Sequence, residues 1–137
     1  MRSPSAGVIV SFVDKRKGRG ILKSSESMKS NTNFKYVYHN GKSYANTYLI
    51  MYVMKNGTEM NRIGISVSKK VGNSVVRHRL TRLIRESYRL NENMFNSGLD
   101  IIVIARAGAR GKGYQEINSA LLHLGKMQKI LKEMIKS

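Results

Sequence analysis

Apolar residues recur along the chain with two different spacings, and the first spacing predicts strands. Residues 62–68, RIGISVS, alternate between apolar and small or polar positions, which is typical of a strand with one buried face. Residues 44–55 are rich in Tyr, Ile, Val and Met and predict a second strand. The Asn56–Gly57 pair between them is a strong hairpin signal, so we expect the two strands to pair antiparallel. Residues 99–105, LDIIVIA, are apolar on both faces and predict a buried central strand.

The second spacing, in which apolar residues recur every three to four positions, predicts helices. Residues 31–39 predict a short helix, and Asn40–Gly41 supplies its stop signal. Residues 74–90 predict a helix whose apolar stripe packs on the sheet. Residues 114–136 predict another long helix after a Gly-rich basic loop at 107–113. The apolar stripe of that last helix consists of Ile117, Leu121, Leu124, Leu131 and Met134.

The beginning of the chain has no long periodic pattern. We interpret residues 1–23 as a flexible basic arm with at most one short strand, followed by a polar, Ser-rich hinge at residues 24–30. The apolar run at residues 6–13 precedes its basic residues, which is the reverse of a secretory signal. No run approaches the roughly 20 apolar residues of a transmembrane helix. We therefore expect a cytoplasmic protein of one domain.

The charge balance changes the picture, because 25 Lys and Arg residues stand against 8 Asp and Glu residues, a net charge of +17. A chain with such self-repulsion usually has a polyanion as partner, either nucleic acid or an anionic membrane surface. On a helical wheel of residues 74–90, the side opposite the apolar stripe is basic. It carries His78, Arg82, Arg85 and Arg89, with Arg77 and Arg79 at its edges. A solvated helix face normally mixes both signs, and only Glu86 does so here, so the row favours phosphate binding.

The segment before this helix points to the same kind of ligand. Lys69 and Lys70 end a strand, and Gly72–Asn73 predicts a tight turn into the helix. A helix begins with free N–H groups and the positive end of its dipole. This order of elements is typical of a phosphate site.

Aromatic residues offer a second candidate surface. Phe34 and Tyr38 lie one turn apart on the first predicted helix, and Tyr52 lies in the middle of a predicted strand. Together they are able to line a groove for unstacked bases, as in proteins that bind single strands. Packing in the core explains the same residue types equally well.

No catalytic constellation is recognisable in the sequence. It contains no Cys and no metalloprotease, serine-hydrolase or P-loop motif, and its three His residues share no metal-ligand spacing. Asp100, at the start of a strand, is a candidate Mg²⁺ ligand, although such a residue is more often a strand-end cap. A Mg²⁺-dependent nuclease acting alone is therefore a weak interpretation, since the acids are scattered.

Two binding classes remain open on the residues alone. One is an RNA-binding protein of another assembly, such as the ribosome, in which small basic α/β domains are common. The other is a DNA-binding factor that uses residues 74–90 as its recognition helix. Strand signals on both sides of that helix argue against the second class, since it needs a companion helix a short turn away.

The stretch KKVGNSVVRHRLTRLIRE, residues 69–86, resembles the signature KKxGNAVxRNRxKRxxRE of the protein component of bacterial ribonuclease P. The resemblance extends through NFKYVYHNGKSYAN at 33–46, RIGISVS at 62–68 and DIIVIAR at 100–106. It covers about residues 22 to 132, and the ordered set of motifs separates this family from the other RNA-binding class.

The resemblance implies both a fold and a role. The fold is a two-layer α/β sandwich with a mixed sheet and a left-handed βαβ crossover, like the second domain of ribosomal protein S5. The general rule for such crossovers favours the right hand. The role is that of an accessory subunit: a catalytic RNA with bound Mg²⁺ hydrolyses precursor tRNA, and the protein binds that RNA and the 5′ leader. No membrane and no obligate protein partner is implied.

The resemblance also assigns residues, none of them catalytic or metal-binding. The RNA-binding positions are Lys69, Lys70, Asn73, Arg77, His78, Arg79, Arg82 and Arg85. The positions of the leader groove are Phe34, Tyr38, Tyr52, Ser66 and Thr81. His78 stands where the family usually has Asn and Thr81 where it usually has Lys, and we expect both on the exposed side of their helix. The resemblance divides the chain into a flexible basic arm, residues 1–21, and an RNA-binding domain, residues 22–137.

Overall fold

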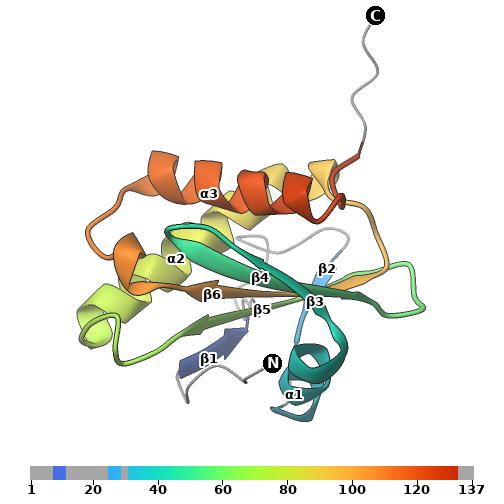
Figure 1. Ribbon diagram of the computed structural model, residues 1–137, viewed down its shortest axis with the longest axis horizontal. Coiled ribbons are helices and arrows are strands. Elements are labelled where there is room, and N and C mark those ends of the chain that lie inside the picture. The colour runs from blue at the N-terminus through green and yellow to red at the C-terminus, as the bar shows by residue number, and fades with distance from the viewer. Residues whose placement is uncertain (1–7, 12–24, 29–30, 133–137) are drawn as a thin grey trace, which may run out of the picture.

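The computed structural model describes residues 8–11, 25–28 and 31–132, which form a mixed β-sheet with helices on both faces (Figure 1). The strands are β1 (Val8–Ser11), β2 (Ser25–Ser27), β3 (Lys42–Ala45), β4 (Leu49–Lys55), β5 (Asn61–Val67) and β6 (Leu99–Ala105). The helices are α1 (Asn31–Asn40), α2 (Ser74–Asn91) and α3 (Tyr114–Met127), with short 3₁₀ turns η1 (Glu92–Met94) and η2 (Ala107–Ala109).

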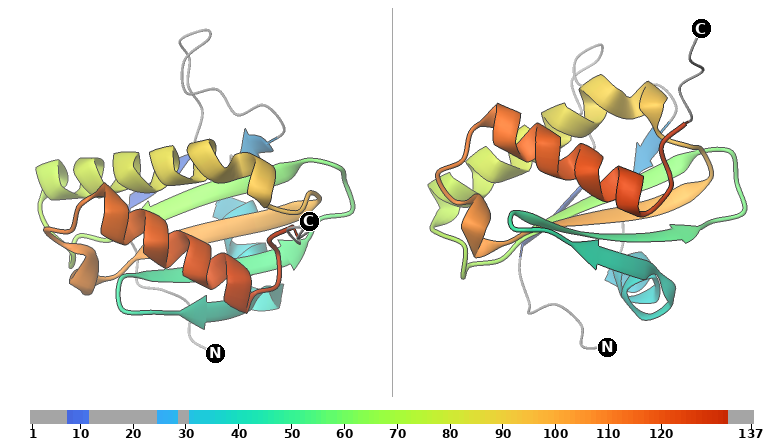
Figure 2. Two further views of the ribbon diagram at one scale, coloured as in Figure 1. Left: turned by 90° about the horizontal axis from the view of Figure 1, so that it is seen from above. Right: turned by 45° about the horizontal axis from the view of Figure 1, so that its top comes forward.

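The sheet has the strand order β1-β5-β6-β4-β3, and β2 also pairs with β5. β5 and β6 are parallel and are joined by α2, whereas β4 is antiparallel to both β6 and β3. In the left panel of Figure 2, the helices α2 and α3 lie above the sheet, and the path from β5 through α2 to β6 turns left-handed. The predicted mixed α/β sandwich with its left-handed crossover is therefore confirmed.

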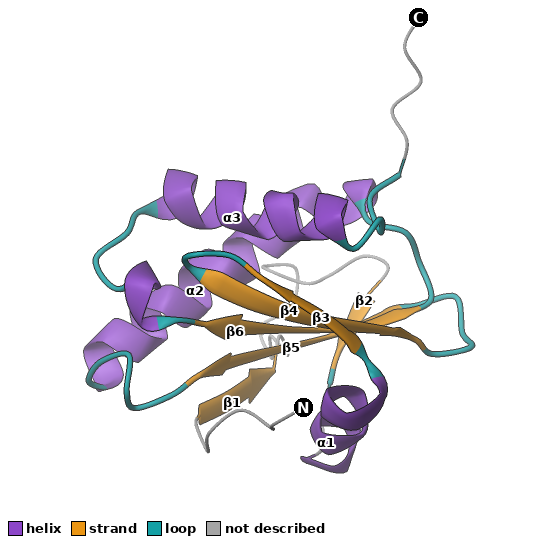
Figure 3. Cartoon of the chain, in the orientation of Figure 1, coloured by secondary structure: helices purple, strands orange, loops and turns teal. Residues whose placement is uncertain are grey.

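Alternate residues of the central strands face two separate parts of the core. Figure 3 shows α2 and α3 over one face of the sheet and α1 against the other. The larger cluster lies under α2 and α3, where Leu80, Ile84 and Leu121 are fully buried. The smaller cluster lies under α1, around Phe34 and Val37. Burying both faces explains why β6 is apolar at successive positions, as predicted for a central strand.

Residues 44–55 do not form the single strand that their composition predicts. The chain turns back at residues 46–48, so that β3 and β4 make a hairpin of their own. The side chain of Asn46 sets this turn, because its Oδ1 accepts hydrogen bonds from the backbone N–H groups of Tyr48 and Leu49. An Asn side chain that closes on the backbone in this way competes with strand pairing.

The predicted antiparallel pairing of residues 44–55 with 62–68 is wrong. β6 lies between β4 and β5 and pairs with both of them. Gly57 does adopt the positive φ of a turn, +74°, as its hairpin signal suggests. The Asn56 side chain, however, donates to Asp100 Oδ1 on β6 over 3.0 Å. The loop therefore carries the chain past β6, and the hairpin signal marks a turn without specifying which strands pair.

Two features also differ from the sequence expectations. The Ser-rich segment 24–30 contains β2, which pairs parallel with β5. Helix α3 ends at Met127 because Lys129 takes a positive φ of 59°, and Leu131 then forms a bridge with Phe95. The predicted stripe position Met134 lies outside the described residues. Within the predicted arm, β1 pairs antiparallel with β5, and the other residues of 1–24 lie outside the described part of the chain.

Candidate nucleic-acid interface

Local sequence explains why α2 presents its basic side outward. Asn73 caps the helix, since its Oδ1 accepts from the backbone N–H of Val76 over 3.0 Å. Leu80 and Ile84 then anchor the inner side of the helix on the sheet, where both are fully buried. Because the helical repeat is fixed, anchoring one side determines where the basic side chains point.

Three of the predicted RNA-binding side chains, His78, Arg79 and Arg82, are exposed on the outer side of α2. Together with Val75, which is 73% exposed, and the half-buried Leu83, they line a hollow of about 510 Å³. We call the exposed residues 75, 78, 79 and 82 the arginine face. A surface that combines guanidinium groups with apolar atoms suits both phosphates and the faces of bases.

The charge of the arginine face is not neutralised within the helix. The one acid of α2, Glu86, forms an ion pair with Arg89, in which Arg89 Nη2 lies 2.6 Å from Glu86 Oε2. The hydrogen bond from Arg89 lowers the pKa of the Glu86 carboxyl. Glu86 is therefore committed to a residue outside the arginine face, which leaves the cations of that face for a ligand.

The remaining predicted RNA-binding residues differ in exposure. The turn that leads into α2 exposes Lys69, Lys70 and Asn73. The side-chain oxygen of Asn73 already accepts the hydrogen bond that caps the helix. Arg77 and Arg85 are half-buried. Arg77 donates from Nη1 to the carbonyl of residue 72 over 2.9 Å, and its Nε is buried without a hydrogen-bond partner. Arg77, which the helical wheel places at the edge of the basic side, is therefore also part of the turn that leads into α2.

The expected exposure of Thr81 is wrong. Thr81 is only 5% exposed, and its hydroxyl donates to the carbonyl oxygen of Arg77 over 2.9 Å. The buried side of α2 is wider than its apolar stripe, since Ser87 and Tyr88 are buried as well. Tyr88, on the same side of α2 as Thr81, hydrogen-bonds Ser25 of β2 over 2.8 Å. A small hydroxyl residue fits this edge, where a long cationic side chain would lose its hydration.

The aromatic residues of the predicted leader groove lie on the other face of the sheet. Phe34 is 1% exposed and Tyr52 is 5% exposed, so neither ring is free to stack on a base in this conformation. The Phe34 ring lies directly on the backbone of β5, since a Cβ atom at Gly64 would stand only 2.4 Å from its Cζ. Both rings therefore belong to the core of this structure, and the assignment of their positions to a leader groove stays a prediction.

Tyr38 is the half-exposed ring of this group. Its centroid lies 5.1 Å from that of Tyr52 in an edge-to-face arrangement. Burial raises the pKa of the Tyr38 hydroxyl to about 12, although a hydrogen bond with the buried Ser66 side chain acts in the opposite direction. Tyr38 and Ser66 therefore form one connected position, and the assignment of this position to a leader groove stays a prediction.

One contact of α2 has no counterpart in the sequence analysis. Arg79 donates from Nη2 to the carbonyl oxygen of Lys112 over 2.8 Å, which ties the basic loop at 107–113 to the arginine face. The next residue of the loop is held by Glu116, whose Oε1 accepts from the N–H of Gly113 over 3.1 Å. The Glu three residues after a helix start is the signal that could have identified this cap.

Asp100 is engaged by a neighbouring strand. Arg62 donates to it from both Nε and Nη2, over 2.7 and 2.5 Å. The sequence analysis names Asp100 as a candidate Mg²⁺ ligand or a strand-end cap. In the structure it is an ion-paired strand residue, which also accepts a hydrogen bond from Asn56. Across the described residues, no group of three or more His, Asp and Glu side chains is placed to hold a metal ion. Within the same part of the chain, no helix combines the length and apolar character needed to cross a membrane.

Comparison with known proteins identifies the family. The family model for ribonuclease P matches residues 22–130. The ribonuclease P protein component of Lachnoclostridium phytofermentans is 66% identical over 107 residues, which cover 78% of this chain and 92% of that protein. The protein component of Alkaliphilus metalliredigens is 50% identical over 110 residues, which cover 80% of this chain and 99% of that protein.

Solved structures agree with this result. The RNase P protein of Staphylococcus aureus superimposes with a TM-score of 0.72 at 36% identity, over 77% of this chain and 97% of that one. The RNase P protein of Thermotoga maritima gives a TM-score of 0.69 at 31% identity, over 74% and 96% of the two chains. Sequence motifs and fold thus agree, and the chain belongs to the family of bacterial ribonuclease P protein components.

Proposed function

We propose that this chain binds the catalytic RNA of ribonuclease P through the arginine face of α2. The observation that carries the proposal is that His78, Arg79 and Arg82 are exposed around a hollow of about 510 Å³, with the nearby acid Glu86 paired to Arg89. Phosphate contacts supply most of the affinity of such surfaces, and the net charge of +17 supports attraction over a longer range.

The family resemblance supplies the finer part of the proposal. The RNA subunit hydrolyses the 5′ leader from precursor tRNA in the cytoplasm, and we assign the Mg²⁺ that this reaction requires to the RNA. The protein contributes binding and orientation, with Tyr38 as the half-exposed ring of the predicted leader groove. Holding a substrate in register accelerates a reaction without any protein group at the reacting phosphate.

A three-armed cleavage assay tests the division of labour. Precursor tRNA with Mg²⁺ is incubated with the protein alone, with a transcribed ribonuclease P RNA alone at low salt, and with both together. We expect no cleavage by the protein alone and faster cleavage by the pair than by the RNA alone. Cleavage by the protein alone would contradict the proposal.

A pair of arginine variants tests the interface. Arg82→Ala removes an exposed cation of the arginine face, and Arg89→Ala makes the same change in net charge on the same helix at the residue paired with Glu86. For Arg82→Ala, the slope of log K against log salt for the RNA should flatten by about one unit. For Arg89→Ala it should change little. Equal slopes for both variants and the unmodified protein would remove the phosphate-contact claim.

A further inference from the structure

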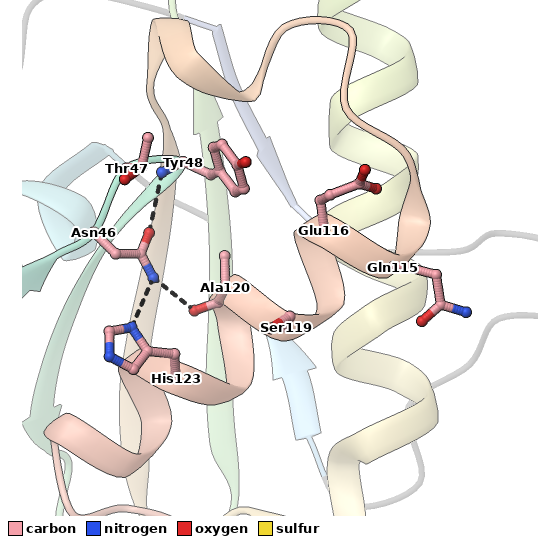
Figure 4. A pocket seen from close by; sticks show the side chains of 8 residues that line it. All are labelled: Asn46, Thr47, Tyr48, Gln115, Glu116, Ser119, Ala120 and His123. Atoms are coloured by element: carbon pink, nitrogen blue, oxygen red, sulfur yellow. Dashed lines mark hydrogen bonds between the residues drawn. The ribbon is translucent and has the colours of Figure 1, made fainter.

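A second hollow of about 600 Å³ lies between the β3–β4 turn and the first turns of α3 (Figure 4). Its lining consists of Asn46, Thr47, Tyr48, Gln115, Glu116, Ser119, Ala120 and His123. The α3 side of the hollow presents the small residues Ser119 and Ala120 where larger side chains would fill the space. We call this the α3 hollow, and it is separate from the hollow of the arginine face.

The wall of the α3 hollow is held in place before any ligand binds. Asn46 donates from Nδ2 to the carbonyl oxygen of Ala120 over 3.0 Å, while its Oδ1 closes the turn. Arg106 holds the turn from the other side, donating from its backbone N–H to Tyr48 and from Nη1 to Asn46. A site with a fixed wall loses little conformational freedom on binding.

Polar groups of the α3 hollow match the edge of a nucleobase. Asn46 Nδ2 lies 3.3 Å from His123 Nδ1. Because an amide nitrogen only donates, His123 Nδ1 is the acceptor in this contact. Glu116 adds a carboxylate whose Oε1 accepts the cap hydrogen bond from Gly113, and the two oxygens of a carboxylate can accept further hydrogen bonds. A carboxylate inside the hollow disfavours a phosphate there and favours the amino group of a base.

The rim of the α3 hollow is cationic and continuous with the arginine face. Lys112 places its Nζ 5.5 Å from the centroid of the half-buried Tyr48 ring. The carbonyl of the same lysine accepts the hydrogen bond from Arg79, and Arg106 is exposed on the opposite side of the turn. An RNA strand on the arginine face would therefore meet these cations next.

We propose that the α3 hollow is a second RNA contact, which takes one unstacked nucleotide of the RNA that binds the arginine face. The base packs against the exposed part of Tyr48 and donates amino hydrogens to Glu116, while Lys112 and Arg106 meet its phosphates. The chemistry selects a base with an exocyclic amino group, adenine, cytosine or guanine, over uracil. This inference rests on the proposed function and extends its footprint from α2 to α3.

Affinity for a transcribed ribonuclease P RNA tests the contact. Ser119→Glu places a negative charge in the α3 hollow, and Asn93→Glu places the same charge at an exposed position of η1, outside the hollow. We expect Ser119→Glu to weaken binding at least about five-fold more than Asn93→Glu. Tyr48→Leu should also weaken binding about five-fold with an unchanged salt slope, since a stacking contact releases no counterions.

Base preference provides the second measurement, with octamers of cytidylate and uridylate as probes. The unmodified protein should prefer the cytidylate octamer. Glu116→Gln should remove that preference, because the amide keeps the helix cap but loses acceptor capacity. Thermal unfolding of each variant confirms that it is folded.

Two results would overturn the inference: Ser119→Glu binding as tightly as Asn93→Glu, or a cytidylate preference that is absent or survives in Glu116→Gln. Neither result affects the proposed function, which fails if the protein alone cleaves precursor tRNA, if the unmodified protein does not bind the RNA, or if Arg82→Ala leaves the salt slope unchanged. The two ideas therefore fail separately.

Discussion

The arginine face of α2 and the aromatic residues around α1 were both predicted to contact RNA, and the structure treats them differently. Arg82 and its neighbours are exposed, whereas Phe34 and Tyr52 are buried in the smaller core cluster. A cation is costly to bury, so a basic residue on a helix is nearly always a surface residue. An aromatic ring is found both in the core and at the surface. The comparison teaches that charge predicts exposure from sequence far better than aromaticity does.

The largest expected effect is a loss of stability when the buried Phe34 side chain is truncated. Phe34→Ala should lower the free energy of unfolding by about 3–5 kcal/mol, because it leaves a cavity between α1 and β5. Arg82→Ala should change it by less than about 0.5 kcal/mol, since its side chain is exposed. Urea unfolding followed by circular dichroism measures both. Similar losses in the two variants would mean that the two surfaces do not differ in their structural role.

A smaller loss is expected at Gly64, where the Phe34 ring meets β5. Ala normally suits a strand better than Gly, but here the added Cβ would stand 2.4 Å from Phe34 Cζ. Gly64→Ala should therefore destabilise the protein by about 1–3 kcal/mol through overpacking. Adding Phe34→Leu should recover part of that loss. If the two substitutions simply add in a double-mutant cycle, the ring does not depend on the glycine.

Tyr38 sharpens the comparison, because it is the aromatic residue of this group that still reaches solvent. Tyr38→Ala should weaken binding of leader-bearing precursor tRNA to the assembled enzyme by about 1–3 kcal/mol, the usual value of a stacked base. Binding of mature tRNA, which has no leader, should hardly change. Equal losses for the two RNAs would instead place Tyr38 with Phe34 as a structural residue.

The Tyr38 hydroxyl gives a test of burial that needs no RNA. Burial raises its pKa to about 12, above the ordinary value of 10.0. The folded state therefore holds this proton more tightly than the unfolded state, and the resulting stability is fully present below pH 10. It is lost as the pH rises through about 12. The free energy of unfolding should fall less steeply with pH in Tyr38→Phe than in the unmodified protein over the accessible part of this range.

The smallest expected effect concerns Glu86, the single acid of α2. Glu86→Gln removes the pair with Arg89, which is worth less than about 1 kcal/mol because both groups are partly exposed. It also releases Arg89 and raises the net charge by one. Affinity for the catalytic RNA should increase slightly and its salt slope should steepen. A weaker affinity would show that Arg89 must be held by Glu86 to make its contact.

Local patterns predicted several elements well for a physical reason. The helix expected at 74–90 is Ser74–Asn91, and the strand expected at 99–105 is Leu99–Ala105. Both elements bury apolar residues at the spacing that their own geometry imposes, so the signal lies within the segment. The turn at Asn46 was also within reach, because a polar Asn46–Thr47 pair interrupts an apolar run.

Other features depend on parts of the chain that lie far apart. No local pattern predicts that β6 inserts between β4 and β5. The order of the strands depends on how both faces of the sheet pack against the helices. A helical wheel gives the angle of Thr81 around α2. It does not show how much of the circumference of α2 the rest of the fold buries, and Thr81 lies within that buried part. The α3 hollow is likewise invisible in sequence, because Tyr48 and His123 are brought together only by the fold.

The central position of β6 has a consequence for the order of events during synthesis. β4 and β5 leave the ribosome well before residues 99–105, yet they do not pair with each other and each needs β6 as its neighbour. Until β6 emerges, the nascent chain is therefore limited to two separate pieces of sheet, the β3–β4 hairpin and the strands β1 and β2 on β5, together with α1 and α2. Non-local pairing of this kind slows folding. During that interval the unpaired edges of β4 and β5 are exposed, and a chain truncated before residue 99 would retain no complete sheet.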